Sequence, residues 1–416
     1  MLRITARVSI GVLALTMGLN NTCRAVEPFH NGGTGNCDGC HTIPPQLKYS
    51  DPSSTCLGCH QAPASSVLPR EPYVASNAEG TALCAQLSPG GDFCWLKRSY
   101  SWYPDRSATR QKISLGERHG HNIIALDFGY VADVVHGYAP GGNYPAGALS
   151  CISCHDPHGS YGRLADGSIR SSGPPIVASG PYNDSPSPGI DSAVGVYGML
   201  AGKGYSPAYL AGSFMFTADP PSAVSPSSYN RAEIVSDTRV AYGIGFSEWC
   251  ANCHTNIQNN QVHGAGRHPA GNAARFSAEV INNYNSYIAS GNLQGYSAIS
   301  YTSLVPFEMG TNDYTILKAA AGGNGANRNG PQGNANVMCL SCHRAHASGW
   351  DNMTRWNMQT EFIVYNGRYP GLDNAAPTDC SQGRTEAETS KTFYDKPAGS
   401  FATYQKSLCN KCHSRD

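Results

Sequence analysis

The chain has 416 residues, and its 29 basic and 29 acidic side chains cancel to no net charge at pH 7. Such a chain lacks the positive field that binding to nucleic-acid phosphates requires, so a nucleic-acid partner is excluded. Glycine contributes 46 residues and proline 27, whereas charged residues make up only 14%. Because glycine and proline both interrupt regular structure, we predict mostly irregular coil with short helices and few strands. Coil alone does not build a dry core, so something other than aliphatic side chains is expected to fill the interior.

The first 25 residues have the three parts of a secretory signal peptide. Two arginines form a basic start, residues 8–19 are apolar, and a short polar stretch ends at Ala25. We predict cleavage after Ala25 and export of the mature chain, residues 26–416. The apolar stretch is shorter than the roughly 20 residues of a membrane span, and no later segment is apolar enough to be one. A lipid anchor at Cys23 is disfavoured because Asn-Asn-Thr precedes it.

Six copies of the pattern C-x-x-C-H account for 12 of the 16 cysteines. In a helical turn, two cysteines three residues apart face the same way and can both form thioethers to one haem, while the adjacent histidine reaches its iron. Zinc sites and redox dithiols also use C-x-x-C pairs, but six copies that all end in histidine, in an exported chain, favour c-type haem. We predict six covalently attached c-type haems, with these histidines as proximal iron ligands. The copies are Cys37-Cys40-His41, Cys56-Cys59-His60, Cys151-Cys154-His155, Cys250-Cys253-His254, Cys339-Cys342-His343 and Cys409-Cys412-His413.

The four cysteines outside the motifs are Cys23, Cys84, Cys94 and Cys380. Cys84 and Cys94 flank a Pro-Gly-Gly turn in an exported chain, which favours a local disulfide over two buried thiols. Cys380 then has no disulfide partner, and we interpret it as a small, half-buried side chain.

The stretches between the motifs are predicted to be surface coil of one continuous domain. Residues 171–189 and 319–336 are rich in Gly, Pro, Ser and Asn, which is typical of loops. Residues 272–291 have the periodicity of a helix, and a second helix is expected to begin at Ser400 and to run into the motif at 409–413. The apolar stripe of the first helix would consist of Phe276, Val280, Tyr284, Tyr287 and Ile288.

Histidines outside the motifs are the candidates for the second axial position of each iron. Six irons need six such ligands, and eight histidines remain, so the numbers favour bis-histidine ligation throughout. With both positions filled by protein, no site is open to a substrate, and we expect electron transfer without catalytic residues. The eight histidines are His30, His119, His121, His136, His158, His263, His268 and His346.

Two of these histidines follow a motif histidine closely. His158 comes three residues after His155, and His346 comes three after His343. Side chains three apart in a helical turn lie on one face, whereas the two axial ligands of one iron lie on opposite faces of the ring. Each later histidine is therefore predicted to ligate a neighbouring haem and to hold two haems close together. The alternative for His158 is an exposed turn residue.

Several stretches resemble the OmcS-type hexahaem c-type cytochromes, the extracellular cytochrome nanowire family of metal-reducing bacteria. The similarity covers nearly the whole mature chain and includes long stretches outside the haem motifs. The matching stretches are PGGDF (89–93), APGGNYPA (139–146), CHDPHG (154–159), TRVAYG (238–243), WCANCHT (249–255), RHPAGN (267–272), CLSCHRAHASG (339–349) and CNKCH (409–413).

The resemblance implies a largely coil fold and subunits that polymerise head to tail into a filament, with haems that form a continuous chain. It implies transfer of respiratory electrons to partners such as other cytochromes, Fe(III) oxides or electrodes, at the outer cell surface. It also implies the distal iron ligands His30, His121, His158, His268 and His346.

The sequence departs from the family at one position. Family members have a histidine three residues after the first motif, which ligates a haem in the adjoining subunit, whereas this chain has Pro44 there. The sixth distal ligand is therefore unassigned. We rank His136 first, because it follows two valines in what we interpret as a partly buried setting, ahead of His263 and His119.

Two other functions compete with the filament. A multihaem reductase would need one haem with an open position, and the six histidine-terminated motifs argue against it. A monomeric electron shuttle has the same haem motifs, and the sequence alone does not distinguish it from a filament subunit.

Overall fold

The structure is a computed structural model, and it describes eleven stretches of the chain. The predicted signal peptide, His30, Pro44, His263, His268 and most of residues 172–184 lie outside them. The stretches are 37–43, 45–63, 73–77, 82–85, 88–105, 107–171, 182–183, 185–226, 238–256, 269–322 and 325–413.

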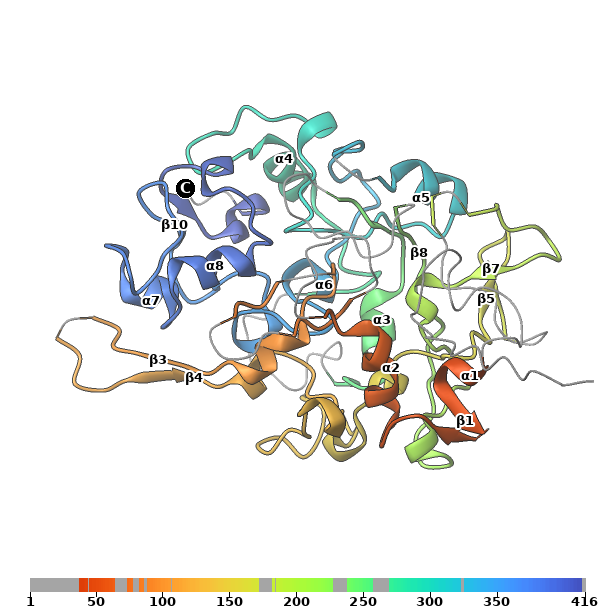
Figure 1. The fold of residues 1–416 in the computed structure, drawn as a ribbon. Coiled ribbons are helices and arrows are strands. Elements are labelled where there is room, and N and C mark those ends of the chain that lie inside the picture. The colour runs from red at the N-terminus through yellow and green to blue at the C-terminus, as the bar shows by residue number, and fades with distance from the viewer. Residues whose placement is uncertain are drawn as a thin grey trace, which may run out of the picture.

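Short helices and long runs of coil make up the described chain, which confirms the predicted fold class (Figure 1). No described helix is longer than nine residues, in line with the glycine and proline content. The α-helices are α1 Cys37–Cys40, α2 Pro52–His60, α3 Phe246–Cys250, α4 Ala278–Ser286, α5 Tyr314–Ala320, α6 Cys339–Cys342, α7 Thr378–Ser381 and α8 Glu386–Thr392. The 3₁₀ turns are η2 Phe93–Lys97, η3 Gly116–His119, η4 Leu126–Phe128, η5 Ala146–Ala148, η6 Cys151–Ser153, η7 Tyr197–Met199, η8 Ala208–Leu210, η9 Ser297–Ile299, η10 Asp351–Met353, η11 Ala398–Ser400 and η12 Leu408–Lys411.

The described strands are two or three residues long and pair antiparallel in small, separate sheets. Five sheets form: β1–β2, β3–β4, β8–β9, β10–β11 and the three-stranded β6–β5–β7. The β3–β4 hairpin extends from one side of the molecule (Figure 1). The strands are β1 His41–Ile43, β2 Gln46–Leu47, β3 Tyr100–Trp102, β4 Lys112–Ser114, β5 Gly162–Arg163, β6 Ile169–Arg170, β7 Val194–Gly195, β8 Ala223–Val224, β9 Ala241–Tyr242, β10 Phe362–Val364 and β11 Gln405–Lys406.

The predicted helix at 272–291 is present but shorter than expected. Ser277 caps it by accepting a hydrogen bond from the Val280 N–H, and it ends at Ser286. Tyr284 of the predicted stripe is fully buried, whereas Ile288 lies beyond the helix and is exposed. Only the central part of the periodic segment therefore forms a helix.

The second predicted helix is wrong. Ser400 ends η11, and the chain then forms strand β11 and turn η12 before the last motif. The buried side chain of Gln405 accounts for the difference, because its amide donates to the hydroxyls of Tyr287 and Ser290 and holds the segment as a strand beside β10.

The buried apolar side chains form several separate clusters, and aromatic residues predominate in the largest of them. Trp350, Trp356 and Tyr284 lie in the largest cluster, and Trp95 lies in a second one. Arg344, Arg355 and Arg384 are also among the largest fully buried side chains. Among the described helices, none is long and apolar enough to cross a membrane.

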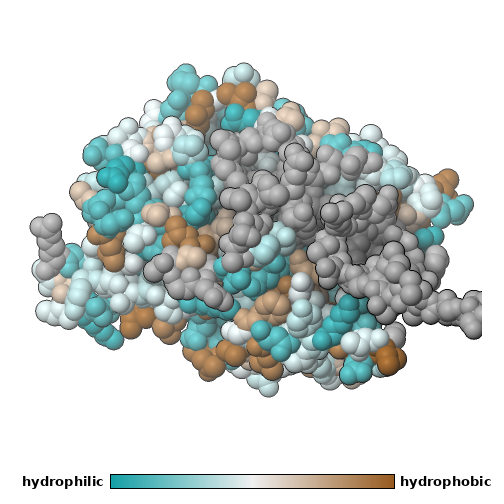
Figure 2. All heavy atoms as spheres, in the orientation of Figure 1, coloured by the Kyte–Doolittle hydropathy of each residue, from teal (hydrophilic) through white to brown (hydrophobic). Residues whose placement is uncertain are grey.

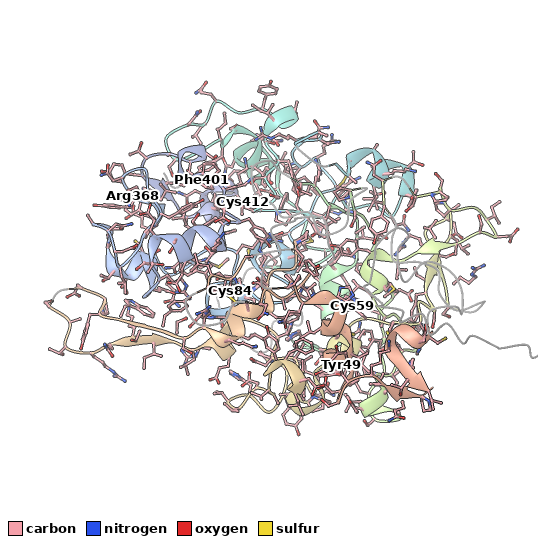
Figure 3. The ribbon with its side chains drawn as sticks, viewed as in Figure 1. Tyr49, Cys59, Cys84, Arg368, Phe401 and Cys412 are labelled. Atoms are coloured by element: carbon pink, nitrogen blue, oxygen red, sulfur yellow. A yellow bond between two sulfur atoms is a disulfide. The ribbon has the colours of Figure 1, made fainter. Side chains whose placement is uncertain are left out.

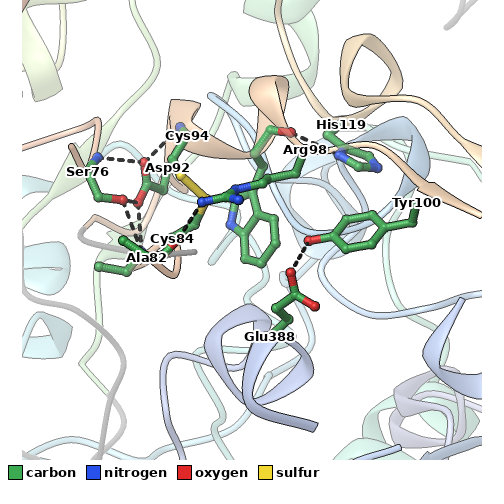
Figure 4. Close-up of a disulfide and its surroundings, with 11 residues drawn as sticks. Ser76, Ala82, Cys84, Asp92, Cys94, Arg98, Tyr100, His119 and Glu388 are labelled. Carbon is green, nitrogen blue, oxygen red and sulfur yellow. Dashed lines mark hydrogen bonds between the residues drawn. A yellow bond between two sulfur atoms is a disulfide. The ribbon is translucent and has the colours of Figure 1, made fainter. Parts of the chain in front are cut away.

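A disulfide joins Cys84 to Cys94, with the Cα atoms 5.6 Å apart. The adjoining loops converge on the buried carboxylate of Asp92, which accepts hydrogen bonds from the backbone N–H groups of Ser76, Ala85 and Cys94 (Figure 4). Cys380 is a buried thiol in α7, more enclosed than the half-buried position expected.

Replacing both Cys84 and Cys94 with serine should lower the free energy of unfolding by about 3 kcal/mol, because the bridge closes a short loop that the unfolded chain would otherwise leave open. Thermal unfolding under oxidising conditions measures the loss. The wild-type protein in reductant should lose the same amount, and the serine variant should be insensitive to reductant. Equal stability of the two proteins in oxidising buffer would contradict the prediction.

Candidate haem-binding sites

Each C-x-x-C-H motif lies on a short helical turn that brings its three side chains together. In four motifs the histidine N–H donates to the carbonyl of the first cysteine at 3.0 Å, which closes one turn: His155, His254, His343 and His413. All twelve motif cysteines lie within the described residues, and none of them forms a disulfide. Two cysteine thiols beside an imidazole on one turn fit thioether attachment of a c-type haem.

The motifs are distributed through the fold, and two pairs of them contact each other directly. Cys59 and Cys412, for example, lie in different parts of the molecule (Figure 3). The turn η6, which begins at Cys151, packs on α2, and the turn α6, which begins at Cys339, packs on α3. The motif at 56–60 therefore adjoins that at 151–155, and the motif at 250–254 adjoins that at 339–343.

Two buried serines hold these pairs together, and the sequence analysis missed both. The Ser53 hydroxyl on α2 accepts a hydrogen bond from the Cys151 N–H at 3.0 Å, and the Ser247 hydroxyl on α3 accepts one from the Cys339 N–H at 3.1 Å. Each serine stands three residues before the first cysteine of its own motif. This extended pattern, S-x-x-C-x-x-C-H, occurs only in these two copies and was the signal that was overlooked.

Hydrogen bonds orient the rings of three motif histidines for metal binding. The Nδ1 atoms of His155, His254 and His343 lie 2.7 to 2.8 Å from the backbone carbonyls of Gly198, Pro140 and Asn352. A carbonyl can only accept, so Nδ1 carries the hydrogen and Nε2 keeps its lone pair for a metal. Burial lowers the pKa of all three imidazoles, which keeps them in the neutral form that iron requires.

Two predicted distal histidines lie opposite motif histidines. The ring centroids of His155 and His346 are 6.4 Å apart, and those of His121 and His254 are 6.1 Å apart. A metal bound at about 2 Å from each of two imidazole nitrogens separates the ring centroids by roughly 6 Å. Burial lowers the pKa of His121 to about 4 and that of His346 to about 3, so both rings are neutral. These pairs fit an iron with two axial histidines.

His119 does not fit an iron, although only one residue separates it from His121. Its Nδ1 lies 3.0 Å from the Trp95 carbonyl, and its Nε2 lies 2.7 Å from the Ser114 hydroxyl. The ring is fully buried, and neither nitrogen is left for a metal. His119 was one of three candidates for the sixth distal ligand, and its role here is to join η2, β4 and the segment around Arg384.

Two further candidates for distal ligands lie at the surface. His158 is exposed, and its backbone N–H donates to Asp156. His136 is also exposed, with its Nδ1 at 3.2 Å from the Asp133 carboxylate. The expectation of a partly buried setting for His136 is therefore wrong, because the two valines before it point to solvent.

The buried carboxylate of Glu308 supports the helix that carries Cys250. It accepts hydrogen bonds from the Phe246 N–H at the start of α3 and from the Asn336 side chain. The pKa of Glu308 is raised from 4.5 to about 7, mainly because the carboxyl group is buried. The folded protein therefore binds a proton that the unfolded chain releases above pH 4.5.

The contribution of Glu308 to stability should fall as the pH rises from about 4.5 to 7, because the unfolded state ionises at Glu308 before the folded state does. One pKa unit corresponds to about 1.4 kcal/mol, so the full loss is about 3 kcal/mol. The Glu308→Gln variant should lack this pH dependence and should be more stable than the wild type at pH 8. Denaturant unfolding from pH 4 to pH 8 tests this, and parallel profiles for the two proteins would contradict it.

Covalent C-x-x-C-H attachment sites with oriented, neutral histidines define the class of protein: a multihaem c-type cytochrome. No protein-family model matches the chain, but it is 45% identical, over 99% of both chains, to "C-type cytochrome OmcS" of Geobacter sulfurreducens. The solved structure of OmcS nanowires from the same organism has a TM-score of 0.84 at 46% identity, and that of the Outer Membrane Cytochrome S filament has 0.85 at 44%. Each covers 93% of this chain and 100% of the solved chain. The chain belongs to the OmcS family of c-type cytochromes.

Proposed function

We propose that this protein is a six-haem electron carrier that is exported, loses residues 1–25 and polymerises head to tail into a conducting extracellular filament. The mature chain, residues 26–416, would act as one hexahaem domain. The observation that carries the proposal is the pairing of a motif imidazole with an imidazole from a distant segment, His155 with His346 and His254 with His121. The solved relatives named as nanowires and filaments support the assembly.

The protein's own residues hold the haems and close the iron sites. The motif cysteines would attach the rings, and the paired imidazoles would occupy both axial positions, so that water and substrates are excluded from the metal. Haem supplies one-electron exchange between ferric and ferrous iron. The carbonyl partners of Nδ1 fix ring orientation and protonation, which tune the reduction potential.

The segment around residues 339–349 would interlock two iron sites. His343 and His346 stand three residues apart, and the ring of His346 faces His155 of another motif. This supports the expectation that closely spaced histidines serve different haems. His158 and His136, the first-ranked candidate for the sixth distal position, complete the proposed set from described residues.

The proposed electron acceptors are extracellular, such as other cytochromes, Fe(III) oxides or electrodes, and the proposed location is the outer cell surface. A contact in which one subunit's surface meets a different surface on the next does not close into a ring, so it generates a filament. Bis-histidine sites suit transfer rather than catalysis, and we therefore propose no enzymatic activity.

Mass spectrometry, spectroscopy and electron microscopy of the purified extracellular protein test this proposal. We expect a mass that corresponds to residues 26–416 with six haems, low-spin spectra for all of them, and thin filaments. A high-spin haem in assembled material would favour a reductase with an open site. Discrete particles at every protein concentration would instead favour a monomeric shuttle.

A further inference from the structure

Two cationic side chains are buried beside the last two haem-attachment motifs. Arg355 exposes only 2% of its surface and Lys411 only 4%, although a charge is costly to bury unless it is paired or well hydrogen-bonded. Charged groups on the surface, where Figure 2 shows hydrophilic residues spread over the visible face, are screened by water and salt. Buried charges are screened much less, so these two act more strongly on a nearby iron site.

The guanidinium of Arg355 is held against the motif at 339–343. Its Nε donates at 2.6 Å to the carbonyl of Leu340, which stands between the two motif cysteines, and a terminal nitrogen donates to the Ser303 carbonyl at 3.0 Å. The backbone N–H of Arg355 donates to the Cys342 carbonyl at 2.8 Å. All three acceptors are neutral carbonyls, so these bonds fix the position of the charge without cancelling it.

Lys411 holds a positive charge within the last motif, where it stands between Cys409 and Cys412. Its ammonium donates to the carbonyl of Tyr287 and lies 4.6 Å from the centre of the Tyr284 ring. A carbonyl dipole and the face of an aromatic ring both attract a cation but carry no net charge. These contacts therefore also leave the positive charge in place.

The segment at 351–356, which carries Arg355, contacts both motifs. The Asn352 carbonyl lies 2.7 Å from the Nδ1 of His343, and the Trp356 indole N–H donates to the Ser407 hydroxyl at 3.0 Å. Ser407 in turn caps the turn η12, which carries the last motif. The same segment thus orients a proximal ligand and sets the position of a buried cation beside two haem sites.

Both positive charges act on the cysteines that attach these two haems. Burial raises the pKa of the Cys342 thiol and that of the Cys412 thiol to about 12, and in each case the adjoining buried cation opposes this increase. At Cys154 and Cys253, the corresponding cysteines of two other motifs, burial and neighbouring thiols raise the pKa, and no described cation opposes them. The last two motifs therefore lie in a more positive environment.

We propose that Arg355 and Lys411 raise the reduction potentials of the haems attached at 339–343 and 409–413, so that these haems accept electrons before those of the two motifs without such a cation. The inference rests on the haem attachment in the proposed function. Reduction of ferric to ferrous iron takes up one electron and lowers the charge of the site by one, which a fixed positive charge favours. A unit charge on the order of 10 Å away, at an effective dielectric constant of about 20, shifts this equilibrium about tenfold.

A spectroelectrochemical titration of the purified holoprotein, in which an electrode supplies the electrons, tests the inference. Arg355→Gln and Lys411→Gln should each shift about one sixth of the haem absorbance change, within the half that is reduced at higher potential. The ferrous-to-ferric ratio of that haem at a fixed potential should fall about tenfold, which is about 59 mV for a one-electron couple. Because both cations are buried, the shifts should persist in about 1 M salt.

Matched variants separate the effect of charge from that of packing. Arg355→Lys keeps the charge and should titrate as the wild type does. Arg163→Gln removes another buried arginine, which donates to the Gly167 and Pro220 carbonyls on β5's side of the molecule, opposite the C-terminus (Figure 1), and should not shift the higher-potential half. Lys411→Gln tests the second site independently if Arg355→Gln does not fold.

The haem content, measured by mass spectrometry, distinguishes the two ways in which the inference can fail. Charge-neutral variants that hold six haems and titrate as the wild type does overturn this inference alone, and so does an equal shift of all the haems. Wild-type protein with fewer than six haems would overturn the proposed function as well.

Discussion

Replacing His346 with alanine should open one axial position, at the haem attached through the motif of His155. The two rings are 6.4 Å apart, and His346 is half-buried, with its ring stacked on Phe93 at 4.8 Å. Alanine has no ligand atom, and a void takes the place of the ring. We expect about one haem of the proposed six to become high-spin and to bind carbon monoxide, and the void to cost about 3 kcal/mol of unfolding free energy.

The matched control for this prediction is His119→Gln. His119 is a fully buried histidine with both nitrogens bonded to protein, so its loss should leave every haem low-spin. The amide replaces these hydrogen bonds only in part, which should cost about 1–3 kcal/mol. Electron paramagnetic resonance with carbon monoxide titration measures the spin states, and thermal unfolding measures the cost. A high-spin signal from the control, or none from His346→Ala, would contradict the pairing.

Gly91→Ala should disrupt the region around His346, because Gly91 lies directly against the backbone of Ala347. Gly91 has φ +98°, and a Cβ there would lie 1.7 Å from the carbonyl oxygen of Ala347. The left-handed conformation alone costs about 1–3 kcal/mol for a residue with a side chain, and the clash with rigid backbone adds to it. The variant should therefore be destabilised by more than 3 kcal/mol, as an order of magnitude.

The displacement caused by Gly91→Ala should also reach the iron ligands. The His346 N–H donates to Gly90, and the His346 and Ala345 carbonyls accept from the backbone and Nδ1 of His121. A shift of the 345–347 segment thus moves ligands of two proposed haem sites. We expect mixed-spin spectra together with a lower melting temperature. Gly333→Ala is the control, because a Cβ there meets nothing within 4 Å, and it should change neither property. Wild-type spectra and stability for Gly91→Ala would contradict this account.

Local chemistry was predictable from the sequence wherever the interacting residues are close in the chain. The C-x-x-C-H turns, the Cys84–Cys94 bridge and the absence of long described helices all depend on spacing or backbone preference within about a dozen residues. Long-range contacts were not predictable in this way. The segment after Ser400 had a plausible helix start, but Gln405 bonds to Tyr287 and Ser290, more than 110 residues earlier, and the segment forms a strand.

The role of each histidine depended most on tertiary structure. His119 and His121 share a local sequence, yet the Trp95 carbonyl and Ser114 occupy both nitrogens of the first, whereas the Ala345 carbonyl binds Nδ1 of the second and leaves Nε2 for a metal. Likewise, the sequence suggested that His346 serves another haem, but only the fold placed it opposite His155.

Covalent haem attachment, a fold dominated by coil, and enough histidines for two per iron could all be inferred from the amino-acid sequence. Tertiary packing sets which described imidazoles face each other, and it sets which ring has both nitrogens engaged in hydrogen bonds. It also placed His136 at the surface rather than in the interior. The difference arises because thioether attachment needs only one helical turn, whereas an axial pair needs two segments, 191 and 133 residues apart in the two pairs described, held at a separation that the whole fold sets.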